Sequence, residues 1–195
     1  METGAVKSGE SVAKAQIGPN AQALLISLRF DYRMPMRGIS AVLAEWFGLQ
    51  LSPGGVSPLL DRKREWSAAS YTEIQSRVRQ SPVVGMDETG LRQDGATGWA
   101  WLARTPEASL FRVEPSRASW VAADNNGSER DIRCLAVFRK VTGGTRSTNG
   151  NRTLGHWMSV TQTLRKNGLP LKDYVVGLNT SHLLGYPPPS VFSPN

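Results

Sequence analysis

The sequence is poor in the residues that build disulfides and zinc sites. Its 195 residues include one cysteine, Cys134, and two histidines, His156 and His182. A lone cysteine excludes an intramolecular disulfide and, with no second cysteine nearby, a thiolate metal site. We therefore expect Cys134 to be a small buried hydrophobic residue. The two isolated histidines are too few for a zinc cage.

Long hydrophobic runs and acidic residues are also scarce. No apolar run approaches the roughly 20 residues that span a bilayer, and the N-terminus lacks the apolar block of a secretory signal. These absences predict a cytoplasmic protein with no membrane partner. The 16 Asp and Glu residues are outnumbered by 23 Lys and Arg residues, which gives a net charge of +7. Such an excess favours polyanionic partners such as nucleic acid, without being specific for them.

The first part of the chain has helical patterns. Residues 1–17 are small and polar without periodicity, which predicts a disordered N-terminus. Apolar residues then recur at helical spacing over 20–32 and 37–47. A long polar helix is expected over 58–80. We expect Pro58 to be its first residue, because a proline deeper inside a helix removes a backbone hydrogen bond.

Two short amphipathic helices, a turn and a basic third helix resemble a helix-turn-helix DNA-binding module over residues 18–80. In that interpretation Arg62, Lys63 and Arg64 contact DNA. A small helical bundle packed on the following domain explains the same pattern equally well.

The periodicity changes after residue 80. The segments "SPVVGMD", "GWAWLART" and "SLFRVEPS" alternate as strands do and are separated by turn signals, which predicts an antiparallel meander. Helical patterns follow at 128–140, 153–166 and 172–178, and a Pro-rich tail occupies 179–195. The expected fold class is therefore α+β or α/β, with the meander and its helices in one domain over residues 81–178.

Two carboxylates occupy informative positions in this pattern. The first strand ends in Asp87, and the helix that follows the meander carries Glu129 in its first turn. Mg²⁺ prefers carboxylate oxygens, and two such ions roughly 3.5–4 Å apart can activate the attacking oxygen and stabilise the leaving one in phosphodiester cleavage. The arrangement has the outline of a ribonuclease-H-like metal site.

The segment "SPVVGMDETGLRQDGATGWAWLARTPEASLFRVEPSRA" resembles the first catalytic block of the insertion sequence 66 family of transposases, and "NNGSERDIRCLAVFRKVTGGTRS" resembles the last block. With similar flanks, the resemblance covers most of residues 18–192. It implies a DDE-type transposase with a ribonuclease-H-like core, which cleaves DNA strands and transfers them with Mg²⁺ or Mn²⁺. DNA, as element ends and target, is the implied partner. The resemblance leaves open whether the chain forms a homo-oligomer.

Carried over residue by residue, the resemblance makes Asp87 and Glu129 catalytic, metal-binding carboxylates. Glu88 is expected to be a neighbour of the site, because successive side chains of a strand point to opposite faces. Asp94 lies in a turn beside a glycine and is expected to be structural. The downstream basic residues expected to contact DNA phosphates are Arg130, Arg133, Arg139, Lys140 and Arg146.

The resemblance also exposes a gap. Such transposases use three carboxylates, and the second Asp follows a further strand. Only the seven residues from Ala118 to Asp124 separate the two blocks here, whereas a crossover to a parallel strand needs a dozen or more. Asp124 is the one acid in the gap and a poor candidate for the missing ligand.

The gap implies a partial copy with an internal deletion: a truncated ribonuclease-H-like core without its central strand. That loss predicts an exposed edge on the meander and marginal stability. Two hypotheses stay open, a working transposase and a catalytically inactive, transposase-derived DNA-binding fragment. A basic domain whose acids are only solvated caps is a third and weaker interpretation.

Overall fold

The computed structural model describes residues 17–114 and 128–193, including all of their side chains except those of 128–132. Within these ranges helices and one antiparallel sheet follow each other in the expected order, which confirms a mixed α+β structure. Most of the predicted disordered N-terminus lies outside the described residues, and so does Asp124.

The first two helices match their predicted positions. Helix α1 spans Pro19–Phe30 and helix α2 spans Met36–Phe47. Gly48 ends α2 in the left-handed conformation, with a φ of 63°. Glycine adopts this conformation without steric cost, which is why it commonly terminates helices.

The expected long helix over 58–80 is instead two helices, so that prediction is wrong. Helix α3 spans Pro53–Trp66 and helix α4 spans Ala68–Gln80. The hydroxyl of Ser52 caps α3 by accepting a hydrogen bond from the Gly55 amide at 3.2 Å, so Pro58 lies inside the helix. The helix is interrupted at Ser67, the residue between α3 and α4. The buried hydroxyl of Ser67 donates a hydrogen bond to the Lys63 carbonyl at 2.9 Å. Side-chain bonds of this kind compete with the backbone ladder of a helix.

The predicted meander is confirmed. Strands β1 (Gly85–Gln93), β2 (Ala96–Arg104) and β3 (Ser109–Glu114) pair antiparallel in the order β1-β2-β3. Asp94 and Gly95 connect β1 to β2 with φ values of 47° and 81°, as a two-residue type I′ hairpin turn requires. Asp94 therefore occupies the structural turn position that its neighbouring glycine predicts.

Three further helices follow, each longer than its sequence pattern indicates. Helix α5 spans Ser128–Thr142, α6 spans Thr148–Lys166 and α7 spans Leu171–Leu184. Residues 179–184 of the predicted tail thus belong to a helix. The tail beyond it packs on the fold, because Val191 is fully buried and Ser70 of α4 donates a hydrogen bond to the Pro189 carbonyl at 3.0 Å.

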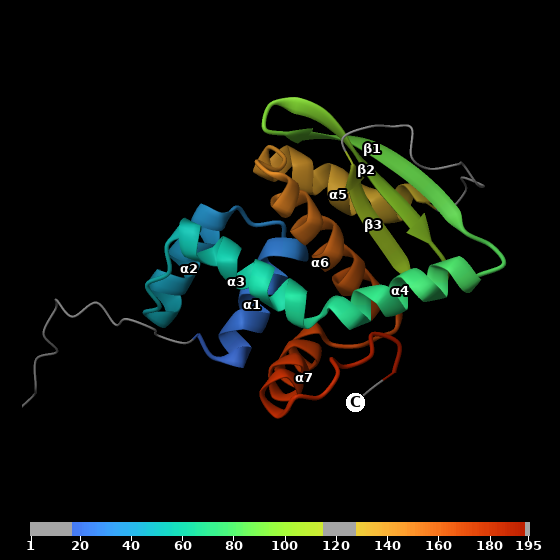
Figure 1. Ribbon diagram of the computed structural model, residues 1–195. Coiled ribbons are helices and arrows are strands. Elements are labelled where there is room, and N and C mark those ends of the chain that lie inside the picture. The colour runs from blue at the N-terminus through green and yellow to red at the C-terminus, as the bar shows by residue number, and fades with distance from the viewer. Residues whose placement is uncertain (1–16, 115–127, 194–195) are drawn as a thin grey trace, which may run out of the picture.

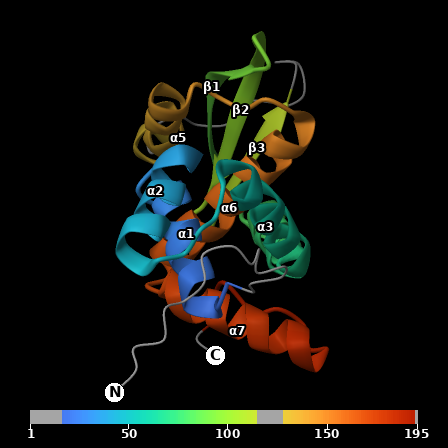
Figure 2. The same cartoon turned by 90° about the vertical axis from the view of Figure 1, so that its left-hand side faces the viewer.

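The sheet and the helices share one hydrophobic core. Figure 1 and Figure 2 place the sheet at one end of the molecule and α7 at the other, with α6 passing between them. Phe30 of α1 stacks on Phe138 of α5 and on Trp157 of α6, with ring centroids 6.4 and 6.2 Å apart. Helices α3 and α4 also pack on α6. This packing agrees with the alternative of a helical bundle seated on the domain that follows it.

Side chains of α6 and α4 cover the outer edge of β3. The Phe111 amide donates to the Ser159 hydroxyl at 2.8 Å, and the Ser109 amide donates to the Thr163 hydroxyl at 3.1 Å. Tyr71 of α4 donates its hydroxyl proton to the Phe111 carbonyl at 3.1 Å. These bonds satisfy polar groups that an unpaired edge strand would otherwise present to other chains.

Candidate functional site

Asp87 lies near the start of β1, opposite Leu102 of β2, and is half-buried. The prediction that the first strand ends in Asp87 is therefore wrong: the strand begins at Gly85 and continues to Gln93, because residues 88–93 also pair with β2. One of its carboxylate oxygens accepts a hydrogen bond from the Glu88 amide at 2.7 Å. Glu88 is also half-buried, and the alternation of the strand directs its side chain to the opposite face. The strand therefore separates the two acids.

Strand β1 is at the edge of the sheet within the described residues. The C-terminal half of this edge is covered. Arg139 of α5 donates from Nη1 to the Gly90 carbonyl. Thr145 forms a parallel bridge with Gln93, with its amide 2.9 Å from the Arg92 carbonyl. The expectation of an exposed edge is therefore wrong for the C-terminal half of β1.

Gly144 makes this cover possible. A Cβ atom at this position would lie 2.2 Å from the Arg92 carbonyl oxygen, and the φ of Gly144 is +100°. Both the close approach and the backbone conformation exclude other residues. The glycine-rich segment after α5 thus packs against the end of β1.

Glu129 lies in the first turn of α5, but its side chain is outside the described residues, as are those of Arg130 and Asp131. Helix α5 packs against β1. Among the described side chains, no three His, Cys, Asp or Glu residues lie close enough together to hold a metal ion. Among the described residues, Asp87 is therefore not part of a cluster of three possible metal ligands.

The basic residues expected to contact DNA are placed very differently from one another. Lys63 faces inward: it is 2% exposed, its ammonium donates to Asn179 Oδ1 at 2.6 Å, and it lies 3.2 Å from the centre of the Trp66 ring. Burial, aided by Arg62, lowers the pKa of Lys63 to about 8. Lys63 is thus a structural residue in this fold.

Other predicted cations are also engaged within the protein. Arg64 donates to Asn149 Oδ1 at 3.0 Å, and Arg139 is held on β1. The remaining described members of the predicted set are exposed to solvent: Arg62, Arg133, Lys140 and Arg146. Among the described residues, no salt bridge holds any of these four side chains.

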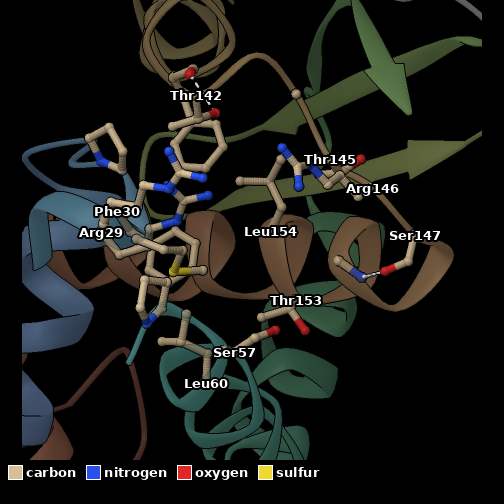
Figure 3. A pocket seen from close by; sticks show the side chains of 18 residues that line it. Arg29, Phe30, Ser57, Leu60, Thr142, Thr145, Arg146, Ser147, Thr153 and Leu154 are labelled. Carbon is tan, nitrogen blue, oxygen red and sulfur yellow. Dashed lines mark hydrogen bonds between the residues drawn. The ribbon is translucent and has the colours of Figure 1, made fainter. Parts of the chain in front are cut away.

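Arg146 also lines a cavity of about 650 Å³ between α1, α2, α3, the end of α5 and the start of α6. Figure 3 shows Arg29 and Phe30 on one side of it, and Arg146 and Ser147 on the other. Arg37 contributes a third guanidinium, and no Asp or Glu lines the cavity. Sequence reasoning missed Arg29 and Arg37. The available signal was that Arg29 follows the buried Leu25 by four residues, on the apolar stripe of α1.

Comparison with known proteins decides the family. A family model described as "Transposase IS66 family" matches residues 14–124, which is more than half of the chain. The chain belongs to the IS66 family of transposases. No curated protein and no solved structure gives a significant match.

The IS66 match includes one of the two predicted catalytic carboxylates and excludes the other. It includes β1 with Asp87, all of α1–α4 and the whole meander, and it ends at Asp124. Glu129 lies beyond the matched range. In the described part of this transposase-family chain, no helix is both long and apolar enough to cross a membrane.

Proposed function

We propose that this IS66-family chain binds DNA without cleaving it, because its ribonuclease-H-like catalytic core is incomplete. The spacing of the two motif blocks carries the proposal. The seven residues Ala118 to Asp124 are too few for a crossover to a parallel strand, which needs a dozen or more. The end of the family match at Asp124 agrees with a junction at this point. The second catalytic carboxylate has no place in so short a segment.

The arrangement of α5 and β1 supports an origin in a DDE site. Figure 1 shows the two elements running in the same direction, and Arg139 near the end of α5 contacts Gly90 in the second half of β1. From Glu129 to Arg139 a helix rises about 15 Å, a length that four or five strand residues also cover. Counting back from this contact along α5 and β1 supports a position for Glu129 beside the start of β1, close to Asp87. Two ligands of the original trio would then remain at one end of the sheet.

Two carboxylates fit a pair of divalent cations poorly. Mg²⁺ or Mn²⁺ in a complete DDE site supplies Lewis-acid activation of the attacking and leaving oxygens. Asp87 already uses one carboxylate oxygen on the Glu88 amide, and the described residues contain no trio of metal-ligating side chains. We therefore assign no metal-dependent step to this chain.

DNA binding is supported by charge. The net charge is +7, and the exposed basic residues Arg62, Arg133, Lys140 and Arg146 have no carboxylate partner among the described residues. Free surface cations of this kind neutralise phosphates and release counter-ions, which makes binding sensitive to salt. The family relationship makes DNA the expected polyanion.

Two assays test the proposal. Fluorescence anisotropy of a labelled mixed-sequence duplex, measured over a series of NaCl concentrations, should show binding that weakens steeply with salt. Nicking of supercoiled plasmid in Mg²⁺ or Mn²⁺ should be no greater for the wild type than for Asp87→Ala. Metal-dependent nicking that Asp87→Ala abolishes would instead establish the working transposase, and binding that salt does not weaken would remove the DNA-binding role.

A further inference from the structure

We propose that the cavity between α1, α2, α3 and the start of α6 binds a phosphodiester group of a DNA strand. This inference rests on the proposed DNA-binding function and gives it a defined contact. The cavity is separate from Asp87, which is not among its lining residues. It lies where the N-terminal helices meet the helices that follow the sheet.

Arg29 is the central observation. Its side chain is 9% exposed, and its guanidinium lies 4.4 Å from the centre of the Phe138 ring and donates from Nη1 to the Met34 carbonyl at 3.0 Å. No carboxylate pairs with it among the described residues. Buried charges in proteins are normally paired, so a buried cation that lines a cavity without a counter-ion indicates an anionic ligand.

Burial lowers the pKa of Arg29 to about 10, so the guanidinium stays charged at neutral pH. The fold therefore retains a positive charge in a desolvated position where a neutral side chain would cost less. The cation–π interaction with the Phe138 ring offsets part of that cost. An anion in the cavity would offset it further, because Coulomb attraction is stronger where water is partly excluded.

The rim of the cavity adds two more cations. Arg37 and Arg146 are both exposed and line the cavity from the start of α2 and from the segment just before α6. Neither has a hydrogen-bond or ion-pair partner among the described residues. With Arg29 they place three guanidinium groups around one space, and guanidinium groups match phosphate oxygens in geometry as well as charge.

Backbone electrostatics act in the same direction. The first turns of α2, α3 and α6 all contribute lining residues, among them Met36, Gly54 and Gly150. None of these three first turns contains an acidic residue. The positive ends of three helix dipoles therefore adjoin the three guanidinium groups without a negative side chain to compensate them.

The size and polarity of the cavity favour a nucleotide backbone over a free small anion. Its volume of about 650 Å³ exceeds what one phosphate fills and leaves room for the adjoining sugar. Phe30, Leu60 and Leu154 supply an apolar part, while Ser57 and Thr153 supply hydroxyl groups. A phosphodiester with its deoxyribose presents this same combination of charge and apolar surface.

Anisotropy with the mixed-sequence duplex tests the assignment through matched variants. Arg37→Ala and Arg146→Ala should each weaken binding several-fold. Each should also reduce the slope of log K against the logarithm of the NaCl concentration by about 0.9 for every phosphate that is no longer neutralised. Ser57→Glu, which adds a carboxylate to the lining, should weaken binding further. Arg79→Ala and Ser76→Glu make the same chemical changes on exposed positions of α4, outside the cavity lining, and should have smaller effects.

The outcomes separate the two proposals. Wild-type binding with unchanged affinity and salt slope in Arg37→Ala, Arg146→Ala and Ser57→Glu would overturn the cavity site and leave DNA binding in place. Equal losses of affinity in the cavity variants and the α4 controls would show a diffuse charge effect and also overturn it. No salt-dependent binding by the wild type would overturn both proposals. Circular dichroism and thermal melting of each variant establish that the fold is intact.

Discussion

Gly155→Ala tests how closely α6 packs on the sheet, because the substitution has two opposite effects. In an exposed helix, replacing glycine by alanine stabilises by up to about 1 kcal/mol. At Gly155, a Cβ atom would lie 2.9 Å from the Phe111 carbonyl oxygen and 3.5 Å from the Arg112 Cα atom. These are backbone atoms of β3, so no side-chain rotation can relieve the overlap.

The magnitude follows from the neighbouring hydrogen bond. Ordinary van der Waals contact begins at 3.4 Å, so α6 would have to retreat by about 0.5 Å to accept the methyl group. The Ser159 hydroxyl, 2.8 Å from the Phe111 amide nitrogen, would then move to about 3.3 Å, beyond the usual range for such bonds. Overpacking of this kind costs about 1–3 kcal/mol. We expect a net loss of about 1–2 kcal/mol after the gain in helix propensity.

Urea unfolding followed by circular dichroism measures this change, with thermal melting as a second readout. A loss of this size should lower the Tm by about 2–8 °C for a chain of this length. Gly54→Ala is the control, since a Cβ atom there meets only the Ser52 hydroxyl, at 3.8 Å. It should leave stability unchanged or slightly raised. A Gly155→Ala protein more stable than the wild type would refute the inferred contact between α6 and β3.

Two further predictions concern buried polar groups. Ser159→Ala leaves the Phe111 amide without its acceptor and should cost about 1–3 kcal/mol, measured by the same urea titration; an unchanged midpoint would contradict the role of α6 in covering β3. His156 is buried, 2.7 Å from the Ser67 hydroxyl, and burial, aided by Arg64, lowers its pKa from 6.5 to about 3. The unfolded chain therefore binds an extra proton between these pH values, so His156 should reduce stability as pH falls from about 6.5 toward 3, by up to roughly 1.4 kcal/mol per pH unit. Urea midpoints measured at several pH values should show a shallower decline in His156→Gln, and identical slopes would count against a neutral buried imidazole.

Much of the secondary structure could be predicted because it depends on local patterns. The three strands follow from alternating residues and turn signals, and the Asp94-Gly95 pair predicts its hairpin. Helices α1 and α2 follow from apolar spacing and from Gly48. The division between α3 and α4 could not be found this way. It depends on Ser67, whose hydroxyl reaches both α3 and His156, a residue far along the chain.

The candidate sites also combine features that are visible in the sequence with contacts that only the fold creates. Asp87 is recognisable within a contiguous motif, and the shortness of the segment before Asn125 is visible by counting residues. Lys63 and Arg64 form part of an evident basic run, but the sequence contains no sign that one turns inward to Asn179 and the other bonds to Asn149. Those contacts join residues more than eighty positions apart.

By itself the sequence determined the family, the strand meander, the excess of positive charge and the short spacing between the two motif blocks. These are properties of contiguous segments and of composition, so they do not depend on how the chain folds back on itself. Only the tertiary structure decided which cations face solvent, how the edges of β1 and β3 are covered, and that Arg29, Arg37 and Arg146 surround one cavity. The reason is physical: burial and charge proximity arise between elements distant in the chain, and no local pattern records them.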